Sequence, residues 1–280
     1  RSYGRWLMFM PSILFWPASI GKESWLLFAL GIAAFGAAKV LTERAIPGLV
    51  VSAVGIGLAA LVRAPIAVVL GAGLVVAGIL RAPRRRLGDL NPGARLVSLA
   101  FFAVLALGLA SLLQGYVVRN ADRDSQGRAG LGDIVQQSIE QTSQGGTEFT
   151  PIGIDSPAGL VIAPVTVMFR PFIHEVPFSP EGVVTSIESM LLLVWSIWRL
   201  RSFLSAFRNI RRVPYVAVAG VYVAGSIIAL SVVANFGIIV RQRTLILPMY
   251  LVLMCFLPKR PRDRRTPQRV PVALTAEGRS

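Results

Sequence analysis

Five basic residues stand at the ends of long apolar runs, where a positive charge needs a partner or a purpose. They are Lys22, Arg63, Arg170, Arg241 and Arg243. The planar guanidinium fork makes paired, charge-assisted hydrogen bonds to phosphoryl oxygens and stays protonated at any working pH. We therefore expect the group to hold the diphosphate of an anionic lipid head group. Simpler interpretations remain open: Arg63 extends to lipid head groups, Lys22 pairs with Glu23, or Arg241 neutralises a lipid phosphate.

Three further residues could serve acid–base chemistry. His174, the only histidine, precedes Glu175 in the segment FRPFIHE, and either could deprotonate a sugar hydroxyl, although a lone histidine can equally be structural. Glu188 lies inside an apolar run, where a carboxylate is a functional candidate by default. It could instead accept a hydrogen bond from Ser186 or Ser189, or relay protons in a transporter.

The sequence predicts neither a metal site nor a cofactor. One histidine with no cysteine nearby falls short of the usual ligand sets. The single cysteine, Cys255, lies in an apolar run and excludes a disulfide within the chain. No Walker loop, GxGxxG turn, HExxH or GxSxG motif occurs, so nucleotide and soluble hydrolase chemistry lack support.

The composition is that of a membrane protein. Hydrophobic residues make up 54% of the chain, charged residues 15%, and the mean hydropathy is +0.63, whereas soluble proteins are roughly 25% charged. The formal net charge is +15, but the basic residues lie between apolar runs and in the tail, without aromatic interleaving. We therefore expect an all-α polytopic transmembrane helical bundle whose partners include membrane lipids and exclude nucleic acid.

Apolar runs predict about seven to eight spans, because about 17 to 25 residues cross the hydrocarbon core. The runs are a partial one at Trp6 to Trp16, then Ser24 to Leu41, Ile46 to Val62, Pro65 to Leu80, Leu96 to Val118, Gly182 to Trp198, Val213 to Val240 and Thr244 to Leu257. Residues 1–257 form a single transmembrane domain in this interpretation, and residues 258–280 form a basic, disordered tail. Because the first run is short, we expect an N-terminally truncated fragment.

Charge bias orients the spans. The segments 81–95, 199–212 and the tail are strongly basic, which predicts that they are cytoplasmic, in a plasma membrane protein whose C-terminus is cytoplasmic. The segment 119–181 carries four arginines against eight acidic residues and is expected to be one long external loop. Its apolar strip, Gly159 to Phe169, is too short to cross, so the loop should contain short interfacial helices. Turns at residues 21–23, 63 and 241–243 then share the external face.

Three segments together resemble a known group of proteins: FMPSILFWPASIGKES (Phe9 to Ser24), FRPFIHE (Phe169 to Glu175) and ANFGIIVRQRTLILP (Ala234 to Pro248). The set resembles bacterial, particularly actinobacterial, multi-pass surface-polysaccharide assembly proteins and is loosely similar to O-antigen polymerases and ligases. The resemblance implies glycan transfer from a polyprenyl-pyrophosphate carrier, with other polysaccharide-assembly proteins as partners. It also implies that Arg170, Arg241 and Arg243 contact the diphosphate, with Lys22 and Arg63 as helpers. His174 and Glu175 match only the external-loop position.

Three functional hypotheses follow. The first is a glycan polymerase or glycosyltransferase acting on a lipid-linked sugar at the outer face. The second is a transporter or lipid-linked sugar flippase, in which Glu188 couples transport and the hairpin at Arg63 is a broken-helix gate. The third is a non-catalytic scaffold whose boundary charges only anchor helices.

Overall fold

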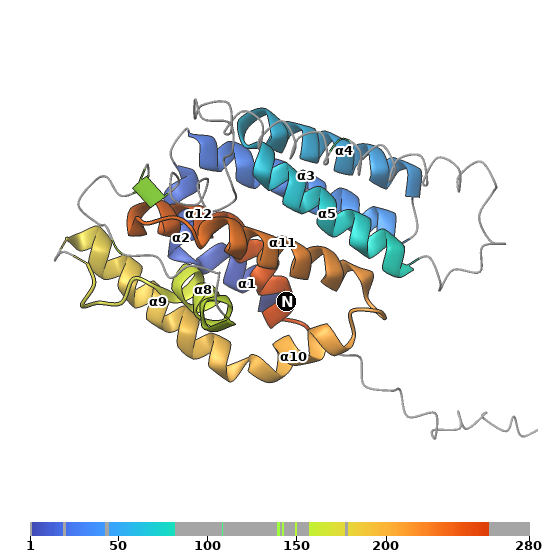
Figure 1. Cartoon of the computed structure of the whole chain (residues 1–280). Helices are drawn as coiled ribbons and strands as arrows, with labels where there is room; N and C mark the ends of the chain where they lie inside the picture. The colour runs from blue at the N-terminus through green and yellow to red at the C-terminus, as the bar shows by residue number, and fades with distance from the viewer. Residues whose placement is uncertain are drawn as a thin grey trace, which may run out of the picture.

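The computed structural model describes residues 2–18, 21–42, 45–81, 108, 139–140, 142, 149, 157–176 and 179–257. All regular elements within these residues are helical, with no β-strand among them, which confirms the all-α class (Figure 1). Three of the helices are long and apolar enough to cross a membrane: Lys22–Leu41, Pro180–Trp198 and Phe236–Met254. Shorter apolar helices accompany them. By length and composition, the chain is a membrane protein.

The helices follow one another in the order α1 (Ser2–Phe9), α2 (Pro11–Phe15), η1 (Trp16–Ala18), α3 (Lys22–Thr42), α4 (Ala45–Val62), α5 (Ala64–Arg81), α8 (Pro157–Phe169), α9 (Pro180–Trp198), α10 (Leu200–Arg208), α11 (Pro214–Leu230) and α12 (Phe236–Met254). Helices α3, α4, α5 and α9 match the predicted runs to within a few residues. The predicted span 96–118, apart from the helical Gly108, most of the loop 119–156, and the tail 258–280 lie outside the described residues. The count of seven to eight spans and the external loop stay predictions.

The boundary between the last two predicted spans is wrong. The sequence placed a turn at residues 241–243, whereas the chain turns after Leu230, and α12 begins at Phe236. Asn235 determines this start, because its side-chain oxygen accepts a hydrogen bond from the backbone N–H of Ile238 at 3.3 Å. Arg241 and Arg243 therefore lie inside a helix and not in a turn.

The predicted partial span at residues 6–16 is also interrupted. Pro11 begins α2, and Pro17 lies in the short 3₁₀ turn η1. A proline lacks the backbone N–H that would continue the preceding helix. The first run is therefore two short helices that pack against the bundle, with Met10 and Ile13 in the core.

Small residues set the spacing between α3 and α4. A Cβ atom at Gly36 would overlap the backbone of Ser52, and one at Gly48 would overlap the backbone of Val40. A Cβ atom at Gly55 would likewise overlap Ala33. Because membrane helices gain little from the hydrophobic effect within lipid, such close backbone approach supplies the packing that holds them together.

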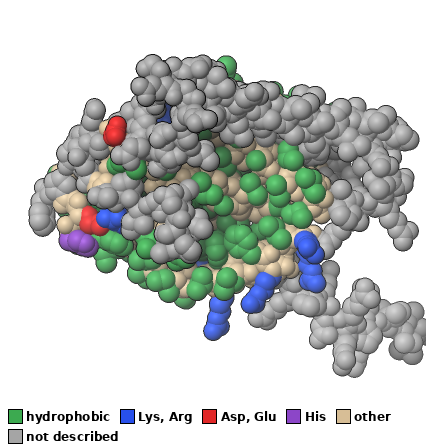
Figure 2. Space-filling view, in the orientation of Figure 1, with side chains coloured by type: hydrophobic (Ala, Val, Ile, Leu, Met, Phe, Trp, Pro, Cys, Tyr) green, Lys and Arg blue, Asp and Glu red, His purple; other side chains and the backbone are tan. Residues whose placement is uncertain are grey.

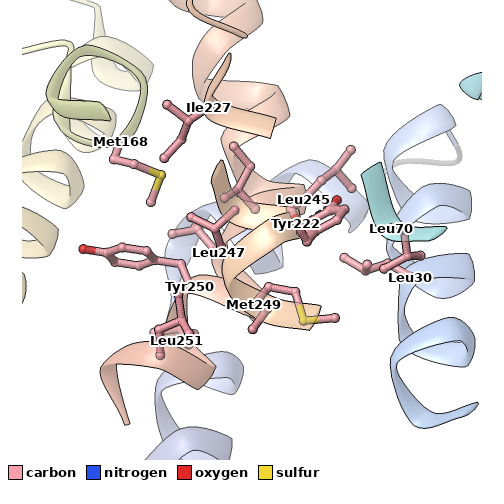
Figure 3. Close-up of a cluster of buried hydrophobic side chains, with 14 of the residues drawn as sticks. Leu30, Leu70, Met168, Tyr222, Ile227, Leu245, Leu247, Met249, Tyr250 and Leu251 are labelled. Carbon is pink, nitrogen blue, oxygen red and sulfur yellow. Dashed lines mark hydrogen bonds between the residues drawn. The ribbon is translucent and has the colours of Figure 1, made fainter. Parts of the chain in front are cut away.

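Helix α12 is the centre of the bundle. In Figure 1, α3, α4 and α5 lie on one side of α11 and α12, and α8, α9 and α10 lie on the other. The buried side chains of α12 meet residues from several helices in one core (Figure 3). They include Leu245, Leu247, Met249, Tyr250 and Leu251 of α12, with Leu30 of α3, Leu70 of α5, Met168 of α8, and Tyr222 and Ile227 of α11.

Helix α9 lies at the edge of the bundle. Its outward residues recur at helical spacing and are exposed: Val184, Ile187, Leu191, Val194 and Trp198. Its opposite face is buried and carries the polar residues Ser186, Glu188 and Ser189. An apolar outer stripe with a polar inner face is the pattern of a helix that contacts lipid on one side.

Candidate functional site

All five basic residues singled out in the sequence lie at one end of the bundle, where α3, α5, α9 and α12 begin and α4, α8 and α11 end. Lys22 opens α3, and Arg63 joins α4 to α5. Arg170 follows α8, while Arg241 and Arg243 are the sixth and eighth residues of α12. The structure divides them into three sets, which differ in exposure and in hydrogen bonding.

The first set, the Glu23 cluster, consists of Lys22, Glu23, Arg63 and Arg241. Arg241 donates from Nη2 to Oε2 of Glu23 at 2.6 Å. The side chain of Arg241 is 47% exposed, whereas Glu23 is buried. The partner of Glu23 is thus Arg241, and no ion pair joins Glu23 to Lys22 in the described part of the chain.

Arg63 is the second arginine whose charge acts on Glu23. Burial lowers the pKa of Arg63 below its ordinary value, and although the attraction of Glu23 opposes this shift, the repulsion from Arg241 adds to it. Lys22 is exposed on the first residue of α3. Two cations, Arg241 and Arg63, therefore act on one carboxylate, and Lys22 is its neighbour in the chain, so the cluster carries an excess of positive charge that suits a phosphate or diphosphate.

The second set, the Arg170 clamp, is internally satisfied. Arg170 donates from Nε and Nη2 to the carboxylate of Glu175 at 2.5 to 3.1 Å, and Glu175 also accepts from the backbone N–H of Phe172 at 2.8 Å. The guanidinium lies 5.0 Å from the ring centroid of Phe149 and 4.9 Å from that of Phe236, and the two rings stack on each other. Such cation–π contacts add to the ion pair.

The hydrogen bonds of the clamp also lower the pKa of Glu175. Burial alone would raise the pKa of Glu175, but the hydrogen bonds from Arg170 and from the backbone of Phe172 outweigh it and hold the pKa below its ordinary value. A carboxylate with a low pKa is a weak general base. His174 is exposed beside the clamp, with its ring 6.1 Å from that of Phe172 and nearly parallel to it.

The third set is interior, and Arg243 is its largest member. Arg243 has no exposed surface, and its Nη1 donates to the carbonyl oxygens of Met168 at 3.0 Å and Arg170 at 3.2 Å and to the hydroxyl of Ser189 at 2.9 Å. These bonds tie α12 to the end of α8 and to α9. Its Nε and Nη2 have no hydrogen-bond partner among the described residues.

Glu188 belongs to the same interior. Its Oε2 accepts from the backbone N–H of Ser12 at 3.0 Å and from the hydroxyl of Ser12 at 2.6 Å. The predicted partners are wrong, because Ser186 and Ser189 donate to carbonyl oxygens of their own helix at 2.8 and 2.9 Å. The second oxygen of Glu188 is buried without a partner among the described residues, and Glu188 attracts Arg243 electrostatically.

Sequence reasoning missed three contributors. It considered Glu23 only as a partner for Lys22, and it did not identify Ser12 or Phe149. Glu23 carried a usable signal, since it is the one carboxylate in the turn that was predicted to share a face with the basic residues. Ser12 and Phe149 carried none, because their partners are 176 residues and 87 residues away in the chain.

Within the described residues, no group of three or more histidine, cysteine, aspartate or glutamate side chains is arranged to hold a metal ion. Comparison of the chain with protein-family models, with curated proteins and with solved structures finds no match.

Proposed function

We propose that the Glu23 cluster binds the phosphorylated head group of a membrane lipid, and that the chain acts on a polyprenyl-pyrophosphate-linked sugar in cell-surface polysaccharide biosynthesis. The observation that supports this proposal is the half-exposed Arg241, oriented by Glu23 and accompanied by Arg63 and Lys22 at the end of the apolar helices. Head-group phosphates lie at the same depth as the ends of membrane-spanning helices.

The five basic residues differ in how many donors remain available for a ligand. Arg241 uses Nη2 to bind Glu23, and its exposed surface leaves other donors for a ligand. Arg170 is committed to Glu175, and Arg243 has no exposed surface. We therefore assign the direct diphosphate contacts to Arg241, Arg63 and Lys22, and we give Arg170 and Arg243 the role of fixing the helices that carry the site.

The proposed reaction is glycosyl transfer at the outer face of the plasma membrane. A sugar hydroxyl attacks the anomeric carbon, the bond from that carbon to the diphosphate oxygen breaks, and the arginines stabilise the charge of the leaving diphosphate. A base must accept the hydroxyl proton. We propose His174 for this role, because it is exposed and not engaged in the clamp, whereas the low pKa of Glu175 disfavours that residue.

The test is lipid binding by the full chain in detergent. We would measure the affinity for undecaprenyl diphosphate and for undecaprenol, which lacks phosphate, in the wild type and in Arg241→Gln. Loss of one charged hydrogen bond, about 1.5 to 3 kcal/mol, predicts diphosphate affinity weaker by about tenfold or more. Arg5→Gln, which changes an exposed arginine on α1 that belongs to none of the three sets, is the matched control. Equal affinity of wild type and Arg241→Gln for the diphosphate would refute the proposal.

A transporter or flippase is the second candidate, and the interior set favours it. A buried carboxylate with one unpartnered oxygen, close enough to attract a buried arginine, is the arrangement that a proton-coupled site needs. In proteoliposomes with an imposed proton gradient, this function predicts lipid-linked sugar translocation that Glu188→Gln abolishes and Ser186→Ala retains. If neither binding nor translocation is found, the scaffold hypothesis is the one that stands.

A further inference from the structure

Helix α10 (Leu200–Arg208) is a short amphipathic helix that begins directly after the last turn of α9. Its apolar residues recur at helical spacing on one face: Leu200, Phe203, Leu204 and Phe207. Arg201 and Arg208, seven residues apart, lie together along the edge of that face. The sequence had suggested only a basic cytoplasmic segment here, so the amphipathic helix is a finding of the structure.

Part of the apolar face holds α10 against the bundle. The ring of Phe203 lies 4.8 Å from that of Phe207 and 6.4 Å from that of Tyr250 on α12. Ala206 is fully buried, and Arg199, just before α10, donates from Nε to the carbonyl oxygen of Met254 at 3.0 Å. The helix is therefore fixed at the end of α12, opposite the end that carries the Glu23 cluster.

The rest of the apolar face is uncovered. Leu200 is 48% exposed, Leu204 45% and Phe207 40%. These residues continue the lipid-facing stripe of α9, which ends in Trp198 at 78% exposure. Tryptophan is enriched where the hydrocarbon core meets the head groups. The position at the end of a spanning helix places α10 at this boundary.

Positive charge gathers at the same edge. Arg201, Arg208, Arg211 and Arg212 are all exposed, and the ion pairs of the described part of the chain include none of them. The sequence has no acidic residue between Ser189 and Arg262. In Figure 2, many apolar side chains lie on the described part of the visible face, and basic side chains project from its lower edge, where Figure 1 places α10.

We propose that α10 and the following turn, residues 200–212, lie in the plane of the membrane and bind the anionic phospholipids of one leaflet. The leucines and Phe207 enter the boundary of the hydrocarbon, and the four arginines contact lipid phosphates. Each basic residue near an anionic surface increases the occupancy of acidic lipid by about fivefold. A bilayer fits this surface better than an acidic protein does, because an exposed apolar face is bordered by exposed arginines at the end of a membrane-spanning helix. This inference is independent of the proposed function, since it concerns the opposite end of the bundle.

The experiment is amide hydrogen exchange on the full chain in nanodiscs made of phosphatidylcholine alone or of phosphatidylcholine mixed with phosphatidylglycerol. We expect exchange in residues 200–212 to slow by about tenfold or more with the acidic lipid, and the effect to shrink at high salt. The variant R201Q/R208Q/R211Q/R212Q should lose the effect while α9 and α12 keep their protection. Arg241→Gln, at the other end, should retain it.

Several results would overturn the proposal. If the wild type exchanged at equal rates in the two lipid compositions, residues 200–212 would have no preference for anionic lipid. If the four-residue variant showed the same slowing as the wild type, the arginines would not be the residues that bind the acidic lipid. Slowing by inorganic phosphate alone in phosphatidylcholine nanodiscs would identify a soluble-anion site, and slowing only when a second protein is present would identify a protein-binding surface.

Discussion

Glycine 55 on α4 offers a sharp test of how α3 and α4 are held together. In Gly55→Ala, the new methyl group would meet the backbone and the Cβ atom of Ala33, with Cα and Cβ of Ala33 each only 2.7 Å away. Gly57 is two residues further along the same helix, and a Cβ atom there would meet nothing within 4 Å. Gly57→Ala is therefore a matched control with the same chemical change and no new contact.

The expected magnitude follows from these distances. Both substitutions gain up to about 1 kcal/mol of helix propensity. Non-bonded carbons prefer about 3.5 to 4.0 Å, so Gly55→Ala requires the two helices to separate by about 1 Å. Because the opposing atoms are backbone and cannot rotate away, the cost is that of overpacking, about 1 to 3 kcal/mol. Gly55→Ala should therefore be less stable than Gly57→Ala by about this amount.

Thermal unfolding in one detergent measures the difference. Trp25 on α3 donates from its indole nitrogen to the carbonyl oxygen of Leu58 on α4 at 2.8 Å. In a background in which the other four tryptophans are replaced by phenylalanine, its fluorescence reports on this interface. We expect a lower midpoint for Gly55→Ala and a midpoint at or above wild type for Gly57→Ala. Equal midpoints for the two variants would show that α3 and α4 are not in the close contact described here.

Three more predictions concern the clamp, the interior and the start of α12. Because the pKa of Glu175 is lowered in the folded state, its pairing with Arg170 stabilises the fold fully above pH 4.5, and this stabilisation is lost as the pH falls through the lowered pKa. In a plot of melting temperature against pH, Glu175→Gln should therefore show a smaller decrease at acidic pH than the wild type. An equal decrease in both proteins would contradict this. Ser12→Ala removes one of two donors to the buried Glu188 and should destabilise the protein by about 1 to 3 kcal/mol, measured by thermal unfolding, where a wild-type midpoint would count against it. Asn235→Ala should cost about 1 kcal/mol, whereas Asn235→Asp should retain most of the stability if the cap is the cause.

The sequence predicted the helical class and the approximate bounds of α3, α4, α5 and α9. Long apolar runs limited by charged residues identify such helices without tertiary information. It failed at the start of α12, because Asn235 stands inside a continuous apolar run and the conspicuous charges at residues 241–243 suggested a turn. A buried polar cap outweighed the charge pattern, and the charges are accommodated by Glu23 and by backbone carbonyl groups.

The candidate site was predictable only in part. Composition and charge bias predicted that the basic residues lie at one end of the bundle. This prediction needs only the position of each residue along its helix. Which of them remain available for a ligand depends on side-chain partners far away in the chain. Arg170 and Arg241 look alike in the sequence, yet Arg170 is paired with Glu175 beside two stacked aromatic rings, whereas Arg241 is half exposed.

The two arginines of α12 have a mechanical consequence. Arg241 and Arg243 are two positions apart, so they point about 200° apart around the helix axis. Arg241 grips α3, and Arg243 grips the last turn of α8 and the polar side of α9. Twisting α12 to relax one attachment would strain the other. A molecule that pulls Arg241 away from Glu23 would therefore exert a torque on the end of α8 and on α9.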